Sequence, residues 1–251
     1  MRLAIIFVAA SAWAFSFSVN ALADSRYISH VTSIDQKVIK SPRNNKKQVL
    51  EGCGPVAAAM LLGYWQTQRG KKNLLSSGFK GLGKHPYTAL RKLYIDLNAK
   101  KAPGANNKAT YTMPNDLFKG LKKRVKGTGL KVKRLRKSKS WKKKKSALLT
   151  QLKNGNPVII LKNKEHKRGC LGQKSRGWNL IKNISNAHYF LVVGFKRKKT
   201  EKSFAIMPGW SDQSKVLANS YSRHRKGSSD FGLCTFDEMK KTNPSLFWIE
   251  P

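Results

Sequence analysis

The sequence contains few acidic residues. Its 251 residues include 12 Asp+Glu against 51 Lys+Arg, which gives a formal net charge of +39 at pH 7. Hydrophobic residues make up 40% of the chain and aromatic residues 10%. That content is enough for a packed core, so the excess of positive charge does not make the whole chain disordered. The length suits one domain of ordinary size or two small ones.

Apolar runs that approach the length of a membrane span are absent after the first 23 residues. Arg2, an apolar run over Leu3–Val19 and a small-x-small pattern ending at Ala23 predict a signal peptide over 1–23. A membrane anchor is the alternative, but the apolar run is interrupted by serines and has the minimum length for a span. We expect cleavage near Ala23, a secreted or periplasmic bacterial protein, and a single mature domain over 24–251.

Cysteine is scarce as well. The three cysteines, Cys53, Cys170 and Cys234, allow three pairings. An exported chain with this count can close one disulfide and leaves one thiol over. We favour a bond between Cys170 and Cys234 because both lie in glycine-containing, loop-like segments. Cys53 would then be the free thiol.

Motifs for metals, nucleotides and serine nucleophiles are missing. The five histidines show no paired ligand spacing. Residues 78–84 match the spacing of a phosphate-binding loop, but His85 stands where a Mg²⁺-binding Ser or Thr belongs. No Gly-x-Ser-x-Gly occurs. The sequence therefore predicts no cofactor and no metal.

The segment around Cys53 carries the strongest functional signal. Pro55 suits the first turn of a helix, and the Ala, Leu and Met residues that follow favour helix. Cys53 is therefore predicted at a helix N-terminus, where free N–H groups and the helix dipole favour the thiolate, the nucleophilic form. A turn that merely starts a buried helix is the alternative.

Two further residues fit a thiol-based site. His188 opens a strand-like run 135 residues after Cys53 and could take up and return a proton. Gln48, five residues before Cys53, could place its amide beside the thiol and, with the Cys53 N–H, stabilise an oxyanion. Taken alone, His188 could be a core histidine and Gln48 a surface glutamine.

Together these segments resemble the papain-like cysteine peptidases, in particular the branch of bacteriocin-processing, double-glycine leader peptidases and their secreted bacterial relatives. The matching segments follow the family's order: Gln48 with 52–61, then 155–160, then 188–195. The resemblance implies Cys53 as nucleophile, His188 as general base and acid, and Gln48 as oxyanion-hole donor. It also implies an α+β fold, in which a helical subdomain with a central helix headed by Cys53 packs against an antiparallel sheet carrying the histidine.

The sequence departs from the family at the third triad position. Relatives usually carry Asp or Asn at the end of the strand after the histidine strand, and Met207 occupies that slot here. A methionine is a weak acceptor for the histidine N–H. Asp212 is the best substitute, and Trp210 could shield the pair from water. A weakened or inactive descendant therefore stays an alternative.

Hydrophobic periodicity predicts the remaining elements. Helices are expected around Pro86–Asn98, from Thr112 and Pro114 to Val125, and from Trp141 to Gly155. Strands are expected near Val38 and Ile39 and over 129–135, 158–162, 188–196, 204–207 and 246–250. Residues 66–112 could form a mobile insertion.

The positive charge also bears on partners. Residues 119–145 contain 15 Lys or Arg and no acid, with apolar residues between them that indicate ordered elements. The positive electrostatic field of these residues attracts polyanions. Candidate partners are a peptide or protein substrate, anionic glycans, lipopolysaccharide and DNA. We expect a secreted cysteine peptidase; the alternatives are a polyanion-binding protein without hydrolytic activity and a transferase or deamidase using the same Cys and His.

Overall fold

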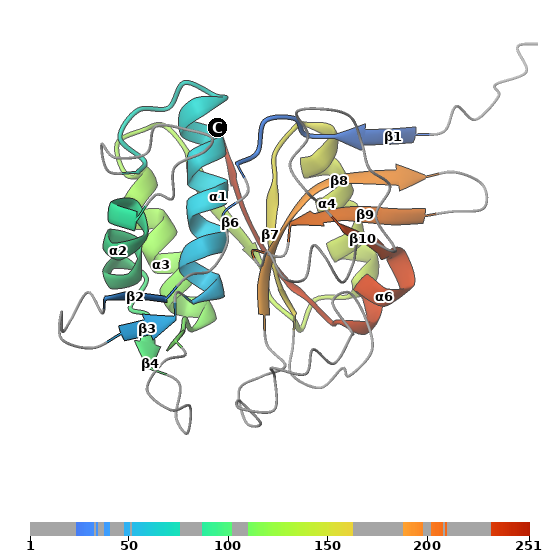
Figure 1. Cartoon of the computed structure of the whole chain (residues 1–251). Coiled ribbons are helices and arrows are strands. Elements are labelled where there is room, and N and C mark those ends of the chain that lie inside the picture. The colour runs from blue at the N-terminus through green and yellow to red at the C-terminus, as the bar shows by residue number, and fades with distance from the viewer. Residues whose placement is uncertain are drawn as a thin grey trace, which may run out of the picture.

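The structure is a computed structural model, and it describes eleven stretches of the chain. They are residues 24–32, 34, 38–40, 48–50, 52–75, 87–101, 110–162, 188–197, 202–207, 209 and 232–251. Figure 1 shows two parts side by side, helices on one side and a sheet with its own helices on the other. Among the described residues, no helix is long and apolar enough to cross a membrane.

A seven-stranded antiparallel sheet forms one part. Six strands follow the order β10-β9-β8-β7-β11-β6, and β1 pairs with the far end of β8. The strands are β1 (Asp24–Tyr27), β6 (Lys131–Leu135), β7 (Val158–Lys162), β8 (His188–Arg197), β9 (Lys202–Met207), β10 (Gly232–Thr235) and β11 (Ser245–Glu250). β7 and β8 are buried nearly throughout and read as continuous apolar runs, because helices cover both faces of the sheet.

The helical part packs on one face of the sheet through α1 (Cys53–Thr67). Every residue of α1 from Gly54 to Trp65 is buried, so the helix is apolar all round. α2 (Tyr87–Asp96) and α3 (Pro114–Val125) pack against α1. Two short hairpins complete this part, β2 (Val38–Lys40) with β3 (Gln48–Leu50), and β4 (Lys100–Lys101) with β5 (Thr110–Tyr111).

The C-terminal end of α1 is fixed by a hydrogen-bonded cluster. Tyr64 Oη donates to Gly155 O at 2.7 Å, and Arg69 Nε donates to Tyr64 Oη at 3.2 Å. Arg69 Nη2 also donates to the carbonyls of Asn154 (3.0 Å) and Gly155 (3.2 Å). The turn before β7 is thereby attached to the end of the central helix.

The opposite face of the sheet has its own apolar core. α4 (Trp141–Lys153) and α6 (Phe236–Lys241) cover it. Strand alternation sends Phe190 and Val192 into this core, and Tyr189 and Leu191 into the core shared with α1. Side chains at the start of β8 therefore pack into both apolar cores, one on each face of the sheet.

The structure confirms the predicted α+β class and the central helix that begins at Cys53. The predicted helices and main strands are present, and their ends coincide with the predicted ones or differ by at most two residues. Five strands (β1, β3, β4, β5 and β10) and the helix α6 were not predicted, although Thr235 and Glu238 form a capping box at the start of α6 that the sequence displays. α2, within the segment interpreted as an insertion, buries Leu90 and Leu93 in the core.

Candidate active site

Cys53 is the first residue of α1. Gly52 is the N-cap in an extended conformation, and no side chain caps the helix. The N–H groups of Cys53 and Gly54 are directed at the Cys53 sulfur, as expected for free first-turn donors. Cys53 is half-buried and is a free cysteine. The helix therefore presents a single thiol to the space beside its first turn.

Two glycines allow a close approach at this turn. A Cβ on Gly52 would lie 2.7 Å from Thr110 Oγ1, and a Cβ on Gly54 would lie 2.7 Å from Thr112 Cβ. Real Cβ atoms do not make such contacts, so only glycine lets the cysteine turn pack against β5 and the residue that follows it. The backbone on both sides of Cys53 is held in place by this contact.

The start of β8 contacts the thiol from the sheet side. The backbone N–H of Tyr189, the residue after His188, donates to Cys53 Sγ. The side chain of Tyr189 reaches into the helical part, where its Oη donates to Thr112 O at 3.2 Å. Cys53, Thr112 and Tyr189 thus join the two parts of the molecule at the place where His188 begins its strand.

His188 is 4% exposed and lies at the end of the sheet. Its ring stacks on Phe190, with centroids 6.4 Å apart and an interplanar angle of 20°. Lys162 is its direct partner across β7 and β8 and is also buried. Burial lowers the pKa of the Lys162 ammonium. A second titratable group that the sequence did not single out therefore adjoins the histidine position.

The charge state of Cys53 differs from the sequence expectation. Burial raises the pKa of the Cys53 thiol from 9.0 to about 11, although the N–H groups of Tyr189, Gly54 and Cys53 act in the opposite direction. Desolvation of the anion outweighs three backbone donors. Cys53 is therefore a thiol at neutral pH until a base takes its proton.

Of the other predicted site residues, Gln48 and Met207 lie within described strands. Gln48 is the first residue of β3 and pairs with Lys40 of β2, with its side chain outside the description. Asp212 and Trp210 lie outside the described residues. Met207 ends β9, is fully buried and pairs with Leu191. Its side chain fills the core shared with α1.

The structure adds Thr112 to the site. Thr112 is 5% exposed, and within the described parts of the chain its Oγ1 has no hydrogen-bond partner. The sequence indicated Thr112 only as the start of a helix, and nothing in the pattern predicts a contact with Gly54. That contact depends on how α3 is placed relative to α1.

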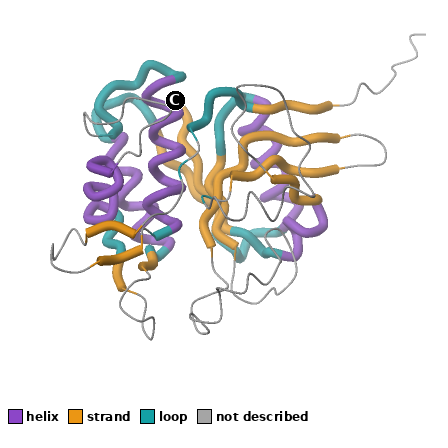
Figure 2. The backbone as a smooth tube through the Cα atoms, in the orientation of Figure 1, coloured by secondary structure: helices purple, strands orange, loops and turns teal. Residues whose placement is uncertain are grey.

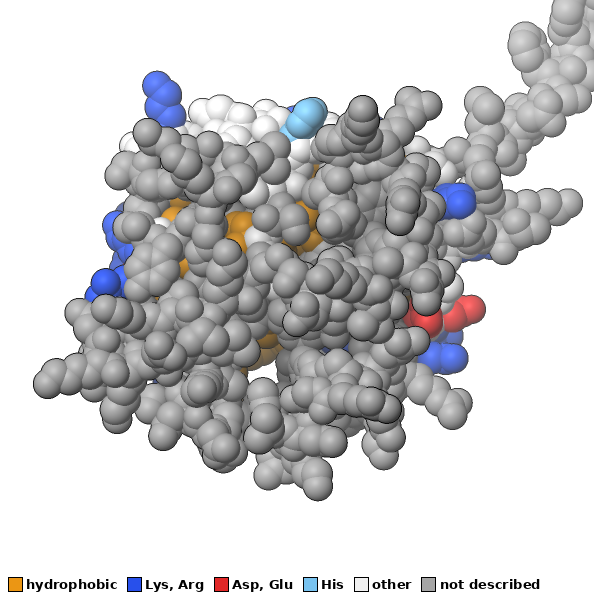
Figure 3. All heavy atoms as spheres, viewed as in Figure 1, with side chains coloured by type: hydrophobic (Ala, Val, Ile, Leu, Met, Phe, Trp, Pro, Cys, Tyr) orange, Lys and Arg blue, Asp and Glu red, His pale blue; other side chains and the backbone are white. Residues whose placement is uncertain are grey.

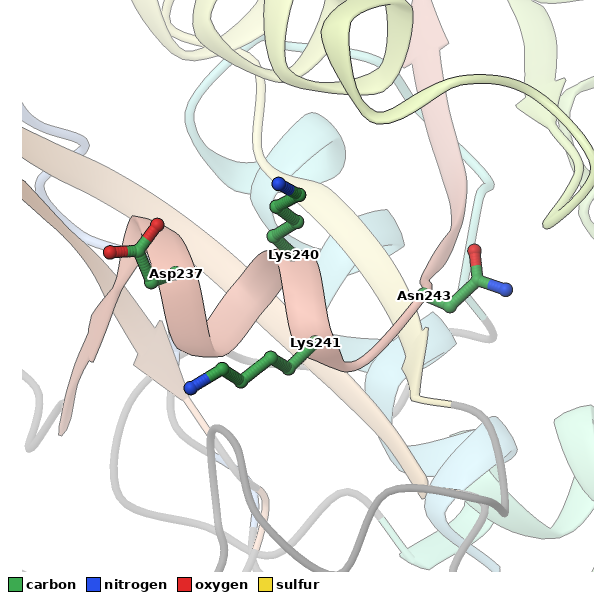
Figure 4. A pocket seen from close by; sticks show the side chains of 4 residues that line it. All are labelled: Asp237, Lys240, Lys241 and Asn243. Carbon is green, nitrogen blue, oxygen red and sulfur yellow. The ribbon is translucent and has the colours of Figure 1, made fainter.

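Outside this site, the described surface carries dispersed basic side chains and one hollow. Figure 3 shows described Lys and Arg side chains at both edges of one face. A surface hollow at α6 is lined by Asp237, Lys240, Lys241 and Asn243, and Figure 4 shows the two lysines leaving the helix in different directions. No group of three His, Cys, Asp or Glu among the described residues could hold a metal ion.

A thiol at the start of a buried central helix, facing the first residues of an antiparallel sheet, defines the papain-like cysteine peptidase class. Comparison with known proteins supports this class. The sequence model of the Peptidase_C39 like family matches residues 28–229. The chain belongs to that family. No curated protein sequence matches the chain.

Solved structures show the same fold. The chain is similar to a fragment of prointerpain A from Prevotella intermedia, with a TM-score of 0.54, 11% identity, and coverage of 89% of this chain and 71% of that one. It is also similar to active interpain A, a cysteine protease of the same organism, with a TM-score of 0.53, 11% identity, and coverage of 90% and 94%. At this identity the likeness shows the fold alone.

Proposed function

We propose that the protein is a secreted cysteine peptidase that hydrolyses peptide bonds through a thioester on Cys53. The observation that carries the proposal is the contact between Cys53 Sγ and the N–H of Tyr189, next to His188. Family membership supports the same reaction class. In the proposed site, Cys53 is the nucleophile, His188 the base and acid, and Gln48 a donor to the oxyanion.

The proposed reaction has two halves. His188 takes the thiol proton, and the Cys53 sulfur attacks the peptide carbonyl carbon. The oxyanion accepts hydrogen bonds from the Cys53 N–H and the Gln48 amide, and the amine leaves with the proton held by His188. Water then attacks the thioester with His188 again as base, which releases the acid and restores the thiol.

We assign the orienting role to Asp212. Gly209 supports this assignment, because a Cβ there would lie 3.0 Å from Val56 Cγ1 in the first turn of α1. At Gly209, three residues before Asp212, the chain that follows β9 therefore lies against the end of α1 that carries Cys53. Met207 is buried in the core and is a weak acceptor.

The pH dependence of Cys53 alkylation tests the proposal. In the mature protein, alkylation of Cys53 that stays rapid well below the ordinary thiol pKa of about 8.5 indicates that a base beside Cys53 takes up the thiol proton during the reaction. His188→Ala should abolish that low-pH reaction, and Asp212→Asn should weaken it. A single titration at or above the ordinary thiol pKa, unchanged in His188→Ala, would contradict the peptidase assignment.

A second candidate is a papain-like protein that binds polyanions without hydrolysis, because the raised pKa of Cys53 leaves its thiol protonated at neutral pH. The net charge of +39 supplies the attraction, which salt would weaken. Cys53→Ala distinguishes the two functions, since it removes hydrolysis and leaves binding to anionic glycans, lipopolysaccharide or DNA intact. A transferase or deamidase would also lose activity, but it would form a product other than cleaved peptide.

We further propose export and one disulfide. Residues 1–23 have the pattern of a signal peptide. Cys53 is free, and Cys234 is buried in β10, which supports a bond between Cys170 and Cys234. Cys170 lies outside the described residues. Mass analysis of the non-reduced, secreted protein should find an N-terminus near Asp24 and one linked peptide pair containing Cys170 and Cys234.

A further inference from the structure

Tyr189 is joined to the cysteine turn, residues 52–54, by two separate hydrogen bonds. Its backbone N–H donates to Cys53 Sγ, and its side-chain Oη donates to Thr112 O at 3.2 Å. The Thr112 side chain packs in turn on Gly54, where a Cβ would lie 2.7 Å from Thr112 Cβ. These contacts form a closed circuit around the thiol, and Tyr189 is its member on the sheet side.

The phenol of Tyr189 is fixed in place. The residue is 3% exposed, and its backbone pairs with Leu161 of β7. Its ring lies 6.2 Å from the ring of Phe247, at an interplanar angle of 57°. Burial, and next the charge of a Cys53 thiolate, raise the pKa of the phenol well above its ordinary value. The hydroxyl is therefore a hydrogen-bond donor throughout the neutral pH range.

The Oη bond is the stronger of the two hydrogen bonds to the turn. A cysteine sulfur is a weak acceptor, whereas a backbone carbonyl is a strong one. Thr112 lies two residues before α3, and α3 packs against α1. The Oη bond thus ties the start of β8 to the helical part. His188 directly precedes Tyr189 in the same strand, so the bond also bears on where His188 lies.

We propose that Tyr189 is a positioning residue of the peptidase reaction, whose hydroxyl, bound to Thr112 O, sets the placement of His188 relative to Cys53. This inference rests on the proposed peptidase function and adds to it a residue that acts through the nucleophile and the base. A base must lie within hydrogen-bond reach of the proton that it takes. A displacement of about 1 Å therefore slows the reaction while the peptide still binds.

Tyr189→Phe tests the proposal, because it keeps the ring and removes only the hydroxyl. The kcat for a peptide that the mature protein cleaves should fall by about tenfold to a hundredfold, with KM within about twofold of wild type. A wild-type kcat in this variant would overturn the proposal, and so would a loss that lies in KM alone. Thermal unfolding of each sample checks that the variant is folded.

Tyr64→Phe is the matched control. The Oη of Tyr64 also donates to a backbone carbonyl, that of Gly155 at 2.7 Å, but at the other end of α1. This variant should lower the melting temperature at least as much as Tyr189→Phe and leave kcat unchanged. An equal loss of kcat in the two variants would mean that any lost tyrosine hydrogen bond slows the reaction through stability, which contradicts a positioning role.

A double-mutant cycle with His188→Ala tests whether Tyr189 acts through the histidine. Alkylation of Cys53 by iodoacetamide is measured at pH 7 in the wild type, both single variants and the double variant. The reagent is uncharged, so the net charge of +39 does not concentrate it. Tyr189→Phe should slow alkylation about tenfold when His188 is present and less than about twofold when it is absent. An equal factor in both backgrounds would overturn the proposal.

The same cycle separates this inference from the peptidase assignment, because alkylation needs no peptide substrate. If His188→Ala slows alkylation and Tyr189→Phe does not, the peptidase assignment stands and the positioning role of Tyr189 is wrong. If His188→Ala leaves alkylation unchanged, the peptidase assignment fails, and the positioning role fails with it.

Discussion

The two ends of α1 differ in how their polar groups are satisfied. At the C-terminal end, Tyr64 and Arg69 place four hydrogen bonds of 2.7–3.2 Å on one another and on the turn before β7. At the N-terminal end no side chain caps the helix, and the hydroxyl of Thr112 has no partner among the described residues. One end is built for stability, and the other leaves hydrogen-bonding groups unused around Cys53.

The difference shows how the fold supports a reactive group. Burial disfavours the thiolate form of Cys53, and a buried hydroxyl without a hydrogen-bond partner costs stability. The cluster at the far end and the apolar surface of α1 offset that cost without contacting Cys53. Substitutions at the two ends should therefore separate activity from stability.

Cys53→Ala should have the largest effect on activity. Loss of the nucleophile removes the thioester route, so hydrolysis should fall by at least about a thousandfold. The melting temperature should stay the same or rise slightly, because a methyl group needs no hydration. Peptide hydrolysis and thermal unfolding of the same sample measure both effects. Tyr64→Phe, at the other end of α1, is the control and should reduce stability alone; wild-type hydrolysis by Cys53→Ala would rule out this nucleophile.

Gly54→Ala should damage both properties. The new Cβ would meet Thr112 Cβ at 2.7 Å, so the cysteine turn or Thr112 must move. A displacement of about 1 Å at the nucleophile lowers the rate of hydrolysis roughly a hundredfold, and overpacking costs about 1–3 kcal/mol of unfolding free energy. Peptide hydrolysis kinetics measures the loss of rate, and denaturant unfolding measures the loss of unfolding free energy.

Gly155→Ala is the matched substitution at the other end of α1. Gly155 has φ +74°, and its Cβ would approach Arg69 Nη2 at 2.7 Å. The expected loss is about 1–2 kcal/mol of stability from the left-handed backbone, with kcat unchanged because the end of a flexible side chain can move. An equal loss of kcat in both alanine variants would show that the ends of α1 are not independent.

Only part of the site at the N-terminal end of α1 could be predicted from the sequence. The helix at Cys53 and the strand at His188 followed from local signals, namely Pro55, the apolar run and β-branched residues. The contacts of Gly54 with Thr112 and of Tyr189 with Cys53 join segments far apart in the chain, and no periodicity encodes them. The raised pKa of Cys53 follows from burial by those same segments, whereas the sequence signal reported only the helix end.

Arg69→Met should reduce stability alone. It removes hydrogen bonds to the carbonyls of Asn154 and Gly155 and to Tyr64 Oη, while keeping an unbranched side chain of similar length. The unfolding free energy should fall by about 1–3 kcal/mol, with kcat/KM within about twofold of wild type. Lys72→Met, an exposed substitution five residues after the end of α1, should change neither. A large loss of activity in Arg69→Met would mean that the far end positions Cys53.

The pH dependence of stability should report the buried thiol. The folded-state pKa of Cys53 is raised from 9.0 to about 11, so its contribution is fully present below pH 9 and is lost as the pH rises through about 11. Between these values the stability of the wild type relative to Cys53→Ala should fall by up to about 2 kcal/mol. Urea unfolding of both proteins at several pH values measures this difference. Titration of the lysines affects both proteins equally, so the difference reports Cys53 alone. A constant difference would show that the pKa of Cys53 is not raised.

Thr112→Val should have the smallest effect, and of opposite sign. Valine has nearly the shape of threonine but needs no hydrogen bond, and the Tyr189 bond is unaffected because it is accepted by the backbone carbonyl of Thr112. Replacing a buried hydroxyl that lacks a partner should therefore raise the unfolding free energy by about 1 kcal/mol. Thr112→Ser keeps the hydroxyl and loses the methyl packed against Gly54, so it should lower stability instead. A less stable valine variant would mean that the hydroxyl is hydrogen-bonded in solution, and that the N-terminal end of α1 is as fully satisfied as the end held by Arg69.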